Sequence, residues 1–139
     1  MPITILITDD HEILRETWKF VLDRDPRFKV IATCSDGESA VEETERLRPQ
    51  IVIMDVNLPG INGIEATRQI IERSPGTKVV GFSLHNVSVY ATKMMAEGAM
   101  GFVTKTSAPE EMFTALLSIH NGHPYVCKEI ELMKQRLSI

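Results

Sequence analysis

Five side chains of this sequence could together carry out phosphoryl transfer, and each of them closes or follows a short apolar run. Two carboxylates, Asp9 and Asp10, follow the first run, and a third carboxylate, Asp55, follows the third run. A hydroxyl group and an ammonium group, at Ser83 and Lys105, stand at the ends of the last two runs. A carboxylate held beside a divalent cation, a lysine and a hydroxyl donor can act as a nucleophile toward phosphorus, because the other groups neutralise charge on the transferring oxygens.

Three carboxylates that meet at one point need a counter-charge. Two unit charges about 4 Å apart repel each other by about 4 kcal/mol at an effective dielectric constant of about 20. Oxygen ligands with open water positions favour Mg²⁺, which is commonly held by one or two carboxylates and a phosphate. Taken singly, an aspartate pair after a strand is more often a helix N-cap, and a lone lysine is usually a solvated charge. The coincidence of suitable residues at four strand ends therefore favours a site with Mg²⁺ as the cofactor.

Two sequence periods alternate along the chain and predict the elements that position these residues. Five stretches have apolar residues that recur every three or four positions, as in amphipathic helices. Ser35-Asp36-Gly37 opens the second of these stretches, and Asn62-Gly63 precedes the third. Apolar runs of strand length alternate with them, at residues 3–8, 28–33, 51–54, 79–83 and 101–104.

This alternation predicts an α/β fold in which helices cover both faces of a parallel sheet. The periodicity leaves the strand order open. Both common orders of doubly wound sheets place their ligand at the carboxyl ends of the strands, where the five candidate residues stand.

Bulk properties exclude several classes of protein. A length of 139 residues suffices for one domain with its own core. A net charge of -4 argues against direct DNA binding by this segment. We expect Cys34 and Cys127 to be free thiols in a reducing cytosol. No apolar segment reaches the roughly 18 residues of a membrane span, and no signal peptide is visible, so we expect a cytoplasmic protein without a membrane partner.

The end of the chain has a different pattern from the rest. Asn-Gly-His-Pro at residues 121–124 breaks the last periodic stretch. We therefore predict one domain over residues 1–121 and a linker or tail over residues 122–139. The tail is a linker or a short helix, because Ile130, Met133 and Leu137 could form a narrow apolar stripe.

Two segments resemble the receiver domain of response regulators in two-component signalling, and the resemblance covers roughly residues 3–121. The phosphorylation-site signature of the family is similar to Ile-Val-Ile-Met-Asp55-Val-Asn-Leu-Pro-Gly-Ile-Asn-Gly-Ile-Glu. A second segment resembles the NarL/FixJ subfamily and reads Gly-Phe-Val-Thr-Lys105-Thr-Ser-Ala-Pro-Glu-Glu-Met. Members of that subfamily usually carry a helix-turn-helix DNA-binding domain after the receiver. The resemblance implies a flavodoxin-like fold with five helices and a five-stranded sheet in the order 2-1-3-4-5.

The resemblance also implies roles for individual residues. Asp55 would accept the phosphoryl group from a sensor histidine kinase. Asp10 would bind Mg²⁺ directly and Asp9 through water, with the backbone carbonyl of Asn57 completing the protein ligands. Lys105 and the hydroxyl group of Ser83 would hold phosphoryl oxygens.

Further residues fall at positions that control switching and lifetime in the family. Phe102 occupies the aromatic switch position, which turns inward as Ser83 moves toward the phosphoryl group; plain core packing is the alternative. Asn57 and His85 occupy positions that tune dephosphorylation, although His85 could equally be an exposed residue at a helix start. His11 is explained as a first-turn helix residue with no catalytic role.

The implied output is a change in the surface formed by the fourth helix, fifth strand and fifth helix. Homodimer formation on phosphorylation would follow, and transcription would be controlled through a DNA-binding domain that is not in this sequence. A stand-alone single-domain regulator is the alternative, with an excised receiver favoured. The chain would not be an enzyme beyond catalysing its own phosphorylation and dephosphorylation.

Other functions fit the sequence less well. A Mg²⁺-dependent phosphatase with an aspartyl-phosphate intermediate usually has a second aspartate two residues after the nucleophile, and Asn57 stands there. A flavin or nucleotide module would need a phosphate-binding loop where Asp9 and Asp10 stand. Thr106 stands where many receiver domains have proline, which leaves the geometry of the Lys105–Thr106 bond open.

Overall fold

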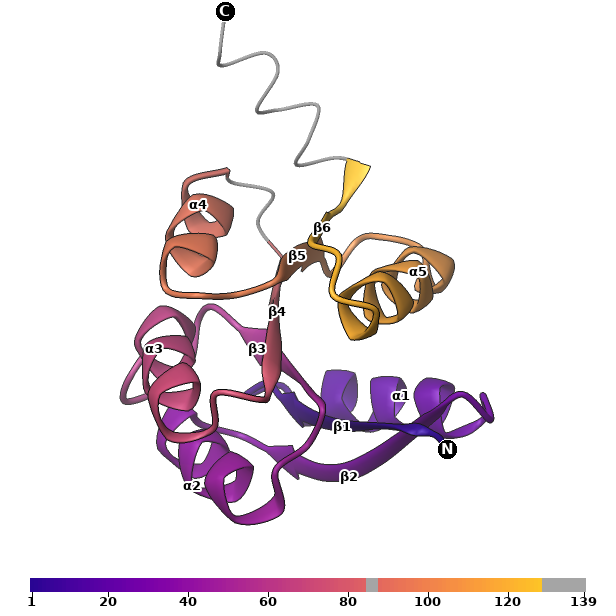
Figure 1. Ribbon diagram of the computed structural model, residues 1–139, viewed down its shortest axis with the longest axis horizontal. Coiled ribbons are helices and arrows are strands. Elements are labelled where there is room, and N and C mark those ends of the chain that lie inside the picture. The colour runs from indigo at the N-terminus through magenta and orange to yellow at the C-terminus, as the bar shows by residue number, and fades with distance from the viewer. Residues whose placement is uncertain (85–87, 129–139) are drawn as a thin grey trace, which may run out of the picture.

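Strands and helices alternate in the computed structural model, which describes residues 1–84 and 88–128 (Figure 1). The strands are β1 (Ile3–Thr8), β2 (Phe28–Cys34), β3 (Ile51–Asp55), β4 (Lys78–Ser83), β5 (Gly101–Thr104) and β6 (Tyr125–Val126). The helices are α1 (Glu12–Asp23), α2 (Gly37–Leu47), α3 (Gly63–Arg73), α4 (Ser88–Ala96) and α5 (Pro109–His120).

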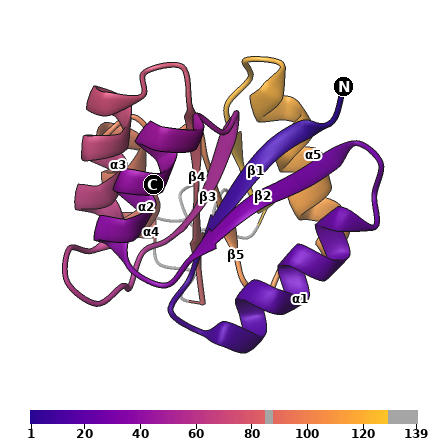
Figure 2. The same ribbon diagram turned by 90° about the horizontal axis from the view of Figure 1, so that it is seen from below.

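The sheet is parallel and has the order β2-β1-β3-β4-β5-β6. Helices α1 and α5 cover one face, and α2, α3 and α4 cover the other (Figure 2). The predicted α/β fold and the order 2-1-3-4-5 are therefore confirmed, and the structure adds a sixth, two-residue strand at the β5 edge. Successive strands are added to one side of β1 at β2 and to its other side from β3 onward, so the carboxyl ends of β1 and β3 flank the switch point of the sheet.

Strand β3 lies at the centre of the molecule, and all five of its residues are buried. A strand covered on both faces requires a continuous apolar run, which Ile51, Val52, Ile53 and Met54 supply. The last residue of the strand is the exception, because it places the carboxyl group of Asp55 in the protein interior with 2% of its surface exposed.

Polar residues fix the beginnings of two helices. The side chain of Asp36 accepts a hydrogen bond from the backbone N–H of Ser39 at 2.7 Å, and Asn62 does the same for Glu65 at 2.9 Å. Helix α1 begins differently, because its N-cap residue His11 has no capping side-chain hydrogen bond. The aspartates at residues 9 and 10 thus do not serve as N-caps, and their carboxylates are left for another role.

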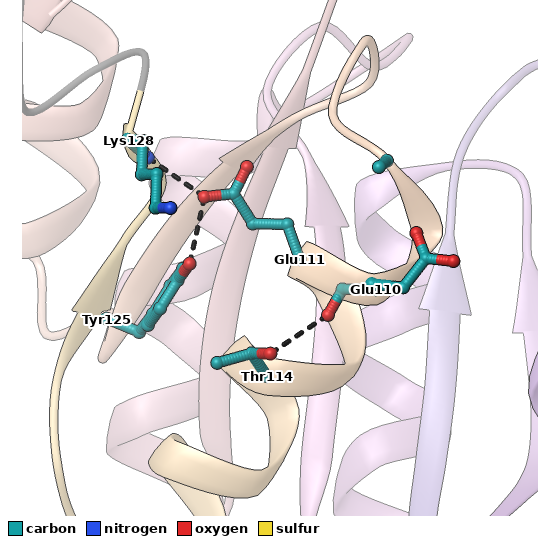
Figure 3. Close-up of a pocket in the computed structure, with 6 residues that line it drawn as sticks. Glu110, Glu111, Thr114, Tyr125 and Lys128 are labelled. Carbon is teal, nitrogen blue, oxygen red and sulfur yellow. Dashed lines mark hydrogen bonds between the residues drawn. The ribbon is translucent and has the colours of Figure 1, made fainter.

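The β6 strand attaches the end of the described chain to the sheet. Its residues pair with Gly101 and Phe102 of β5, and the backbone N–H of Cys127 donates to the Phe102 carbonyl at 3.0 Å. Glu111 of α5 accepts hydrogen bonds from the Tyr125 hydroxyl at 2.8 Å and from the Lys128 N–H at 2.9 Å (Figure 3). Residues 125–128 therefore pack on the domain that was predicted to end at residue 121.

The remainder of the predicted tail, with its possible helical stripe, lies outside the described residues. The division into residues 1–121 and 122–139 stays a prediction. Both cysteines are free and buried. In the described parts of the chain, no helix combines the length and apolar character that crossing a membrane requires.

Candidate functional site

Strands β1, β3 and β5 bring three charged side chains together at their carboxyl ends. The Nζ atom of Lys105 lies 2.6 Å from Oδ2 of Asp9 and 3.2 Å from Oδ2 of Asp55. All three side chains are at most 3% exposed. One ammonium group is thus shared by two buried carboxylates, which leaves one negative charge without a counter-charge inside this group of three.

The backbone around Lys105 directs its side chain toward the carboxylates. The backbone N–H of Lys105 donates to the Ser83 carbonyl at 2.7 Å, which ties the end of β5 to the end of β4. The Nζ atom lies 5.6 Å from the centre of the Phe82 ring, close enough for a cation–π contact. The described residues contain no cis peptide bond, so the Lys105–Thr106 bond is trans.

A tight approach of α3 shapes the floor of the site. A Cβ atom at Gly63 would overlap the backbone carbonyl oxygen of Asp55, so only glycine fits there. The Gly63 N–H donates to the Val56 carbonyl at 2.9 Å. The Asn57 N–H in the same turn donates to Oδ1 of Asp55 at 3.2 Å, which orients the carboxyl group.

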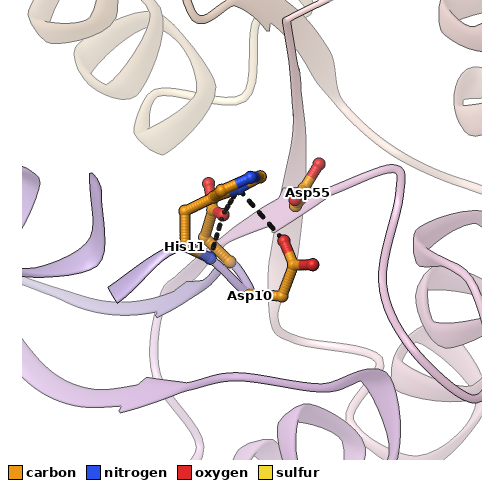
Figure 4. Close-up of side chains that lie close together, drawn as sticks. Asp10, His11 and Asp55 are labelled. Atoms are coloured by element: carbon orange, nitrogen blue, oxygen red, sulfur yellow. Dashed lines mark hydrogen bonds and ion pairs between the residues drawn. The ribbon is translucent and has the colours of Figure 1, made fainter. Parts of the chain in front are cut away.

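The turn between β1 and α1 carries the remaining charged groups. Nδ1 of His11 lies 3.0 Å from Oδ1 of Asp9 and 3.1 Å from Oδ1 of Asp10 (Figure 4). The His11 backbone N–H also donates to Oδ1 of Asp9 at 2.9 Å, and Arg15 donates to the Asp9 carbonyl at 2.7 Å. Asp10 and His11 are exposed, whereas Asp9 is buried.

The two buried carboxyl groups have opposite pKa shifts although they share one lysine. Burial opposes ionisation of Asp9, but hydrogen bonds from Lys105 and from the His11 backbone outweigh it and lower the pKa of Asp9. Burial raises the pKa of Asp55 to about 6, because attraction to Lys105 does not offset the burial and the charge of Asp9 repels a second negative charge. The protein therefore stabilises the charge of Asp9 and leaves the charge of Asp55 poorly stabilised.

These groups fit a metal ion. One ligand atom from each of Asp9, Asp10, His11 and Asp55 lies within 4.8 Å of the others, so one ion could contact all four. The carboxylate oxygens are hard donors of the kind that Mg²⁺ and Ca²⁺ prefer. The buried Oδ2 atoms of Asp9 and Asp55 depend on a single ammonium group, and a cation would supply the missing positive charge.

The other predicted site residues are placed by the same strands. Ser83 ends β4 and is fully buried, beside Thr104 of β5. Phe102 is fully buried and packs against Gly81, where a Cβ atom would come within 2.6 Å of its ring. This position is what core packing requires, and an inward-turned switch residue would occupy it too. His85 lies outside the described residues.

Two residues of the site were missed from the sequence. His11 is more than a first-turn residue, since its ring lies against two carboxylates, and Arg15 holds the backbone of the turn. The adjacency of His11 to the aspartate pair was a signal that could have found it. Nothing in the spacing pointed to Arg15, whose side chain reaches back six positions.

Comparison with known proteins agrees with the geometry. Residues 5–117 match the family described as the response regulator receiver domain. Over 124 residues the chain is 39% identical to the transcriptional regulatory protein DegU of Brevibacillus brevis, which covers 89% of this chain and 52% of DegU. It is 34% identical over 128 residues to the response regulator UvrY of Escherichia coli K12, covering 92% of this chain and 59% of UvrY. The chain thus spans little more than half the length of these relatives.

A solved structure extends the match to three dimensions. The crystal structure of a two-component response regulator of the LuxR family from Aurantimonas sp. SI85-9A1 has a TM-score of 0.92 and 34% sequence identity. The match covers 99% of both chains. The family match over most of the sequence, together with this fold, shows that the chain belongs to the receiver domains of two-component response regulators.

Proposed function

We propose that Asp55 accepts a phosphoryl group from the phosphohistidine of a sensor histidine kinase. The observation that carries this proposal is the buried carboxyl group of Asp55, at the end of β3 and 3.2 Å from the Lys105 ammonium. Its pKa of about 6 leaves it mostly ionised at neutral pH, and poor stabilisation of that charge favours its reaction.

The transfer is a displacement at phosphorus. A carboxylate oxygen of Asp55 attacks, a bond between oxygen and phosphorus forms, and the bond from phosphorus to the histidine nitrogen breaks with its electron pair leaving on the imidazole. Lys105 neutralises charge on the phosphoryl oxygens, and the Ser83 hydroxyl donates a hydrogen bond to one of them. Mg²⁺, when bound, would supply further positive charge at these oxygens.

Four residues would hold the Mg²⁺ ion. We assign it to the carboxylates of Asp10 and Asp55, to Asp9 through water, and to the backbone carbonyl of Asn57. The support is the short distance among the carboxylate oxygens and the hydrogen bond that ties Asn57 to Asp55. Asn57 and His85 would then flank the water that removes the phosphoryl group. The domain would catalyse its own phosphorylation and dephosphorylation and no other reaction.

The output would pass through the face formed by α4, β5 and α5. The switch residues Ser83 and Phe102 lie on the adjacent strands β4 and β5, and exposed apolar side chains are found at Leu84, which follows β4, and at Val89 of α4. We propose that phosphorylation changes this face, promotes a homodimer and controls transcription through a DNA-binding domain outside this sequence. DegU, a transcriptional regulatory protein that is longer than the matched region, supports this part. A cytoplasmic location belongs to the same proposal.

The experiment is intact-mass spectrometry after incubation with acetyl phosphate, with and without Mg²⁺. We expect one added phosphoryl group on the wild type and on a Glu45→Gln control, which removes an exposed carboxylate from α2. We expect none on Asp55→Asn, and little on any protein in the presence of a chelator. Equal phosphorylation of Asp55→Asn and wild type would overturn the assignment.

A further inference from the structure

The imidazole of His11 occupies the space that a cation would use between two carboxylates. Its Nδ1 atom lies 3.0 Å from Oδ1 of Asp9 and 3.1 Å from Oδ1 of Asp10 (Figure 4). The side chain is 57% exposed, so the ring can turn without disturbing the core.

The two oxygens of Asp9 face different partners, which makes the position of His11 specific. Oδ2 of Asp9 contacts the Lys105 ammonium at 2.6 Å, on the buried side of the site. Oδ1 contacts the His11 ring and accepts the His11 backbone N–H at 2.9 Å. A cation bound by Asp9 and Asp10 therefore meets the imidazole on the open side of the site, away from the lysine.

The backbone of the turn is held in place, so the response to a cation falls on the His11 side chain. Arg15 donates to the Asp9 carbonyl at 2.7 Å, and the Arg15 N–H donates to the His11 carbonyl at 3.0 Å. The Asp9 N–H donates to the Cys34 carbonyl of the neighbouring strand at 3.1 Å. These bonds fix the turn on both sides of the Asp9–Asp10–His11 segment.

Cations differ in how they treat an imidazole at this place. Mg²⁺ prefers oxygen ligands, so it gains nothing from the ring and must displace it from its hydrogen bond to Asp9 and its contact with Asp10. Co²⁺, Ni²⁺ and Zn²⁺ accept neutral imidazole nitrogen readily, and they bind mixed nitrogen and oxygen sites more tightly than the hard cations do. The same side chain thus opposes one class of ion and adds a ligand for the other.

We propose that His11 determines the metal selectivity of this site, by ligating late transition-metal ions through its ring nitrogen and by competing with Mg²⁺ for the carboxylates. This proposal rests on the cation site of the proposed function. It adds a nitrogen ligand to that oxygen site, and it makes the domain a binder of Co²⁺, Ni²⁺ or Zn²⁺ at concentrations far below those of Mg²⁺.

The test is isothermal titration calorimetry of tag-free protein at one fixed pH, with Mg²⁺ and Ni²⁺ titrated separately. His11→Ala removes the ring, and His11→Asn keeps a hydrogen-bond donor for the carboxylates without an imidazole nitrogen. His123→Ala, which removes an exposed histidine from the turn after α5, is the matched control.

We expect both His11 substitutions to weaken Ni²⁺ binding about tenfold or more, the range seen when a metal site loses a supporting group. Mg²⁺ affinity should rise in His11→Ala and stay near the wild-type value in His11→Asn. Ni²⁺ affinity that changes no more than in His123→Ala would overturn the proposal. An equal loss of Mg²⁺ and Ni²⁺ affinity would also overturn it, because His11 would then only shape the turn.

A second measurement uses the protein's own fluorescence. Trp18 is the sole tryptophan, and its ring packs edge-on against the Phe82 ring at 5.6 Å, the same ring that Lys105 overlies. Mg²⁺ titrations followed by Trp18 emission should show the same order of affinities as calorimetry. Neither measurement involves phosphorylation, so failure of the selectivity proposal and failure of Asp55 as phosphoacceptor remain separate results.

Discussion

The two ends of the central sheet both contain buried polar groups, but those groups are paired differently at the two ends. At the amino ends of the strands, the buried Ser74 and Thr77 hydroxyls lie 2.7 Å apart, and Thr77 donates to the Pro49 carbonyl at 2.8 Å. Lys78 donates to the carbonyls of Ile119 and His120 at the end of α5. At the carboxyl ends, by contrast, the buried Asp9 and Asp55 share the single ammonium of Lys105.

The difference separates a structural end from a functional one. At the amino end, the neutral hydroxyl groups bond to each other and the Lys78 ammonium bonds to carbonyls at a helix C-terminus. These groups need no ligand as a partner, so their hydrogen bonds contribute to stability. At the carboxyl end, two buried carboxylates have only one lysine as a counter-charge. This excess negative charge lowers the free energy of unfolding unless a cation, alone or together with a phosphoryl group, is bound. A fold that violates local consistency at one place commonly does so at its functional site.

The buried Lys105 and the partly exposed Lys78 give the largest expected contrast. Lys105→Met should leave two uncompensated carboxylates in the interior and cost about 3 kcal/mol in free energy of unfolding at neutral pH, as for other broken buried ion pairs. Lys78→Met should cost about 1 kcal/mol, because it removes only two hydrogen bonds to carbonyls at the end of α5 and leaves no charged group without a partner. Urea unfolding with chelator present measures both, and equal losses would contradict the division between the two ends.

The pKa of Asp55 predicts a gain in stability when its charge is removed. A folded-state pKa of about 6, above the ordinary value of about 3.9, means that ionisation penalises the folded state. The penalty is absent below pH 4, grows between pH 4 and 6, and is complete above pH 6. Asp55→Asn should therefore be more stable than the wild type by something on the order of 2 kcal/mol at pH 7 without metal, and the gain should vanish near pH 4.

Asp9→Asn supplies the matched comparison, because the pKa of Asp9 is lowered. Its ionised form stabilises the folded state at pH values above the ordinary pKa, and this contribution is lost as pH falls through the folded-state pKa. Asp9→Asn should therefore destabilise the protein at pH 7. Equal signs for the two substitutions in urea melts would show that the carboxylates are equivalent.

Two buried threonines test what a hydrogen-bonded hydroxyl group contributes to stability in comparison with one that has no partner. Thr77→Val removes a hydroxyl that bridges Ser74 and Pro49, and it should cost about 1–2 kcal/mol because their polar atoms lose a partner. Thr44 is also fully buried, but its hydroxyl has no hydrogen-bond partner among the described residues. Thr44→Val should be neutral or slightly stabilising. Thermal unfolding of the two variants decides, and a larger cost at Thr44 would contradict this account.

The sequence was enough to predict most of the fold and the composition of the site. Apolar periodicity located the five long strands and the helices, and strand ends located Asp9, Asp55 and Lys105. The order of the strands in the sheet was predicted from the resemblance to receiver domains, because periodicity does not show which strands pair with each other. Strand β6 could not be predicted, because two residues carry no period and their place depends on hydrogen bonds with β5 and Glu111.

The electrostatics of the site lay beyond the sequence. The Lys105 ammonium lies 2.6 Å from the Asp9 carboxylate and 3.2 Å from the Asp55 carboxylate. This difference follows from the path of the backbone and from packing. The opposite pKa shifts of Asp9 and Asp55 depend on burial, on the hydrogen bonds that each carboxyl group accepts and on the charge of its neighbours. The position of His11 depends on a side-chain torsion, which residue spacing does not specify.

The smallest expected effect concerns Glu111, a carboxylate near the same end of the sheet as Asp55 but supplied with donors. Burial would raise its pKa, but the Lys128 N–H and the Tyr125 hydroxyl donate to it and lower the pKa below its ordinary value. Burial and this carboxylate together raise the pKa of Tyr125 to about 12. Glu111→Gln keeps the shape and removes the charge, so it should cost less than about 1 kcal/mol and lower the pKa of Tyr125 toward its ordinary value.

Phenolate absorbance in a Tyr90→Phe background, where Tyr125 is the remaining tyrosine, measures that pKa directly. Glu110→Gln, the neighbouring exposed carboxylate, is the control and should leave it unchanged. If Glu111→Gln instead stabilised the protein as Asp55→Asn is expected to, unsatisfied charge would be a property of the whole carboxyl end of the sheet. A small loss would confine it to the residues that face Lys105, where a phosphoryl group and its cation would bind.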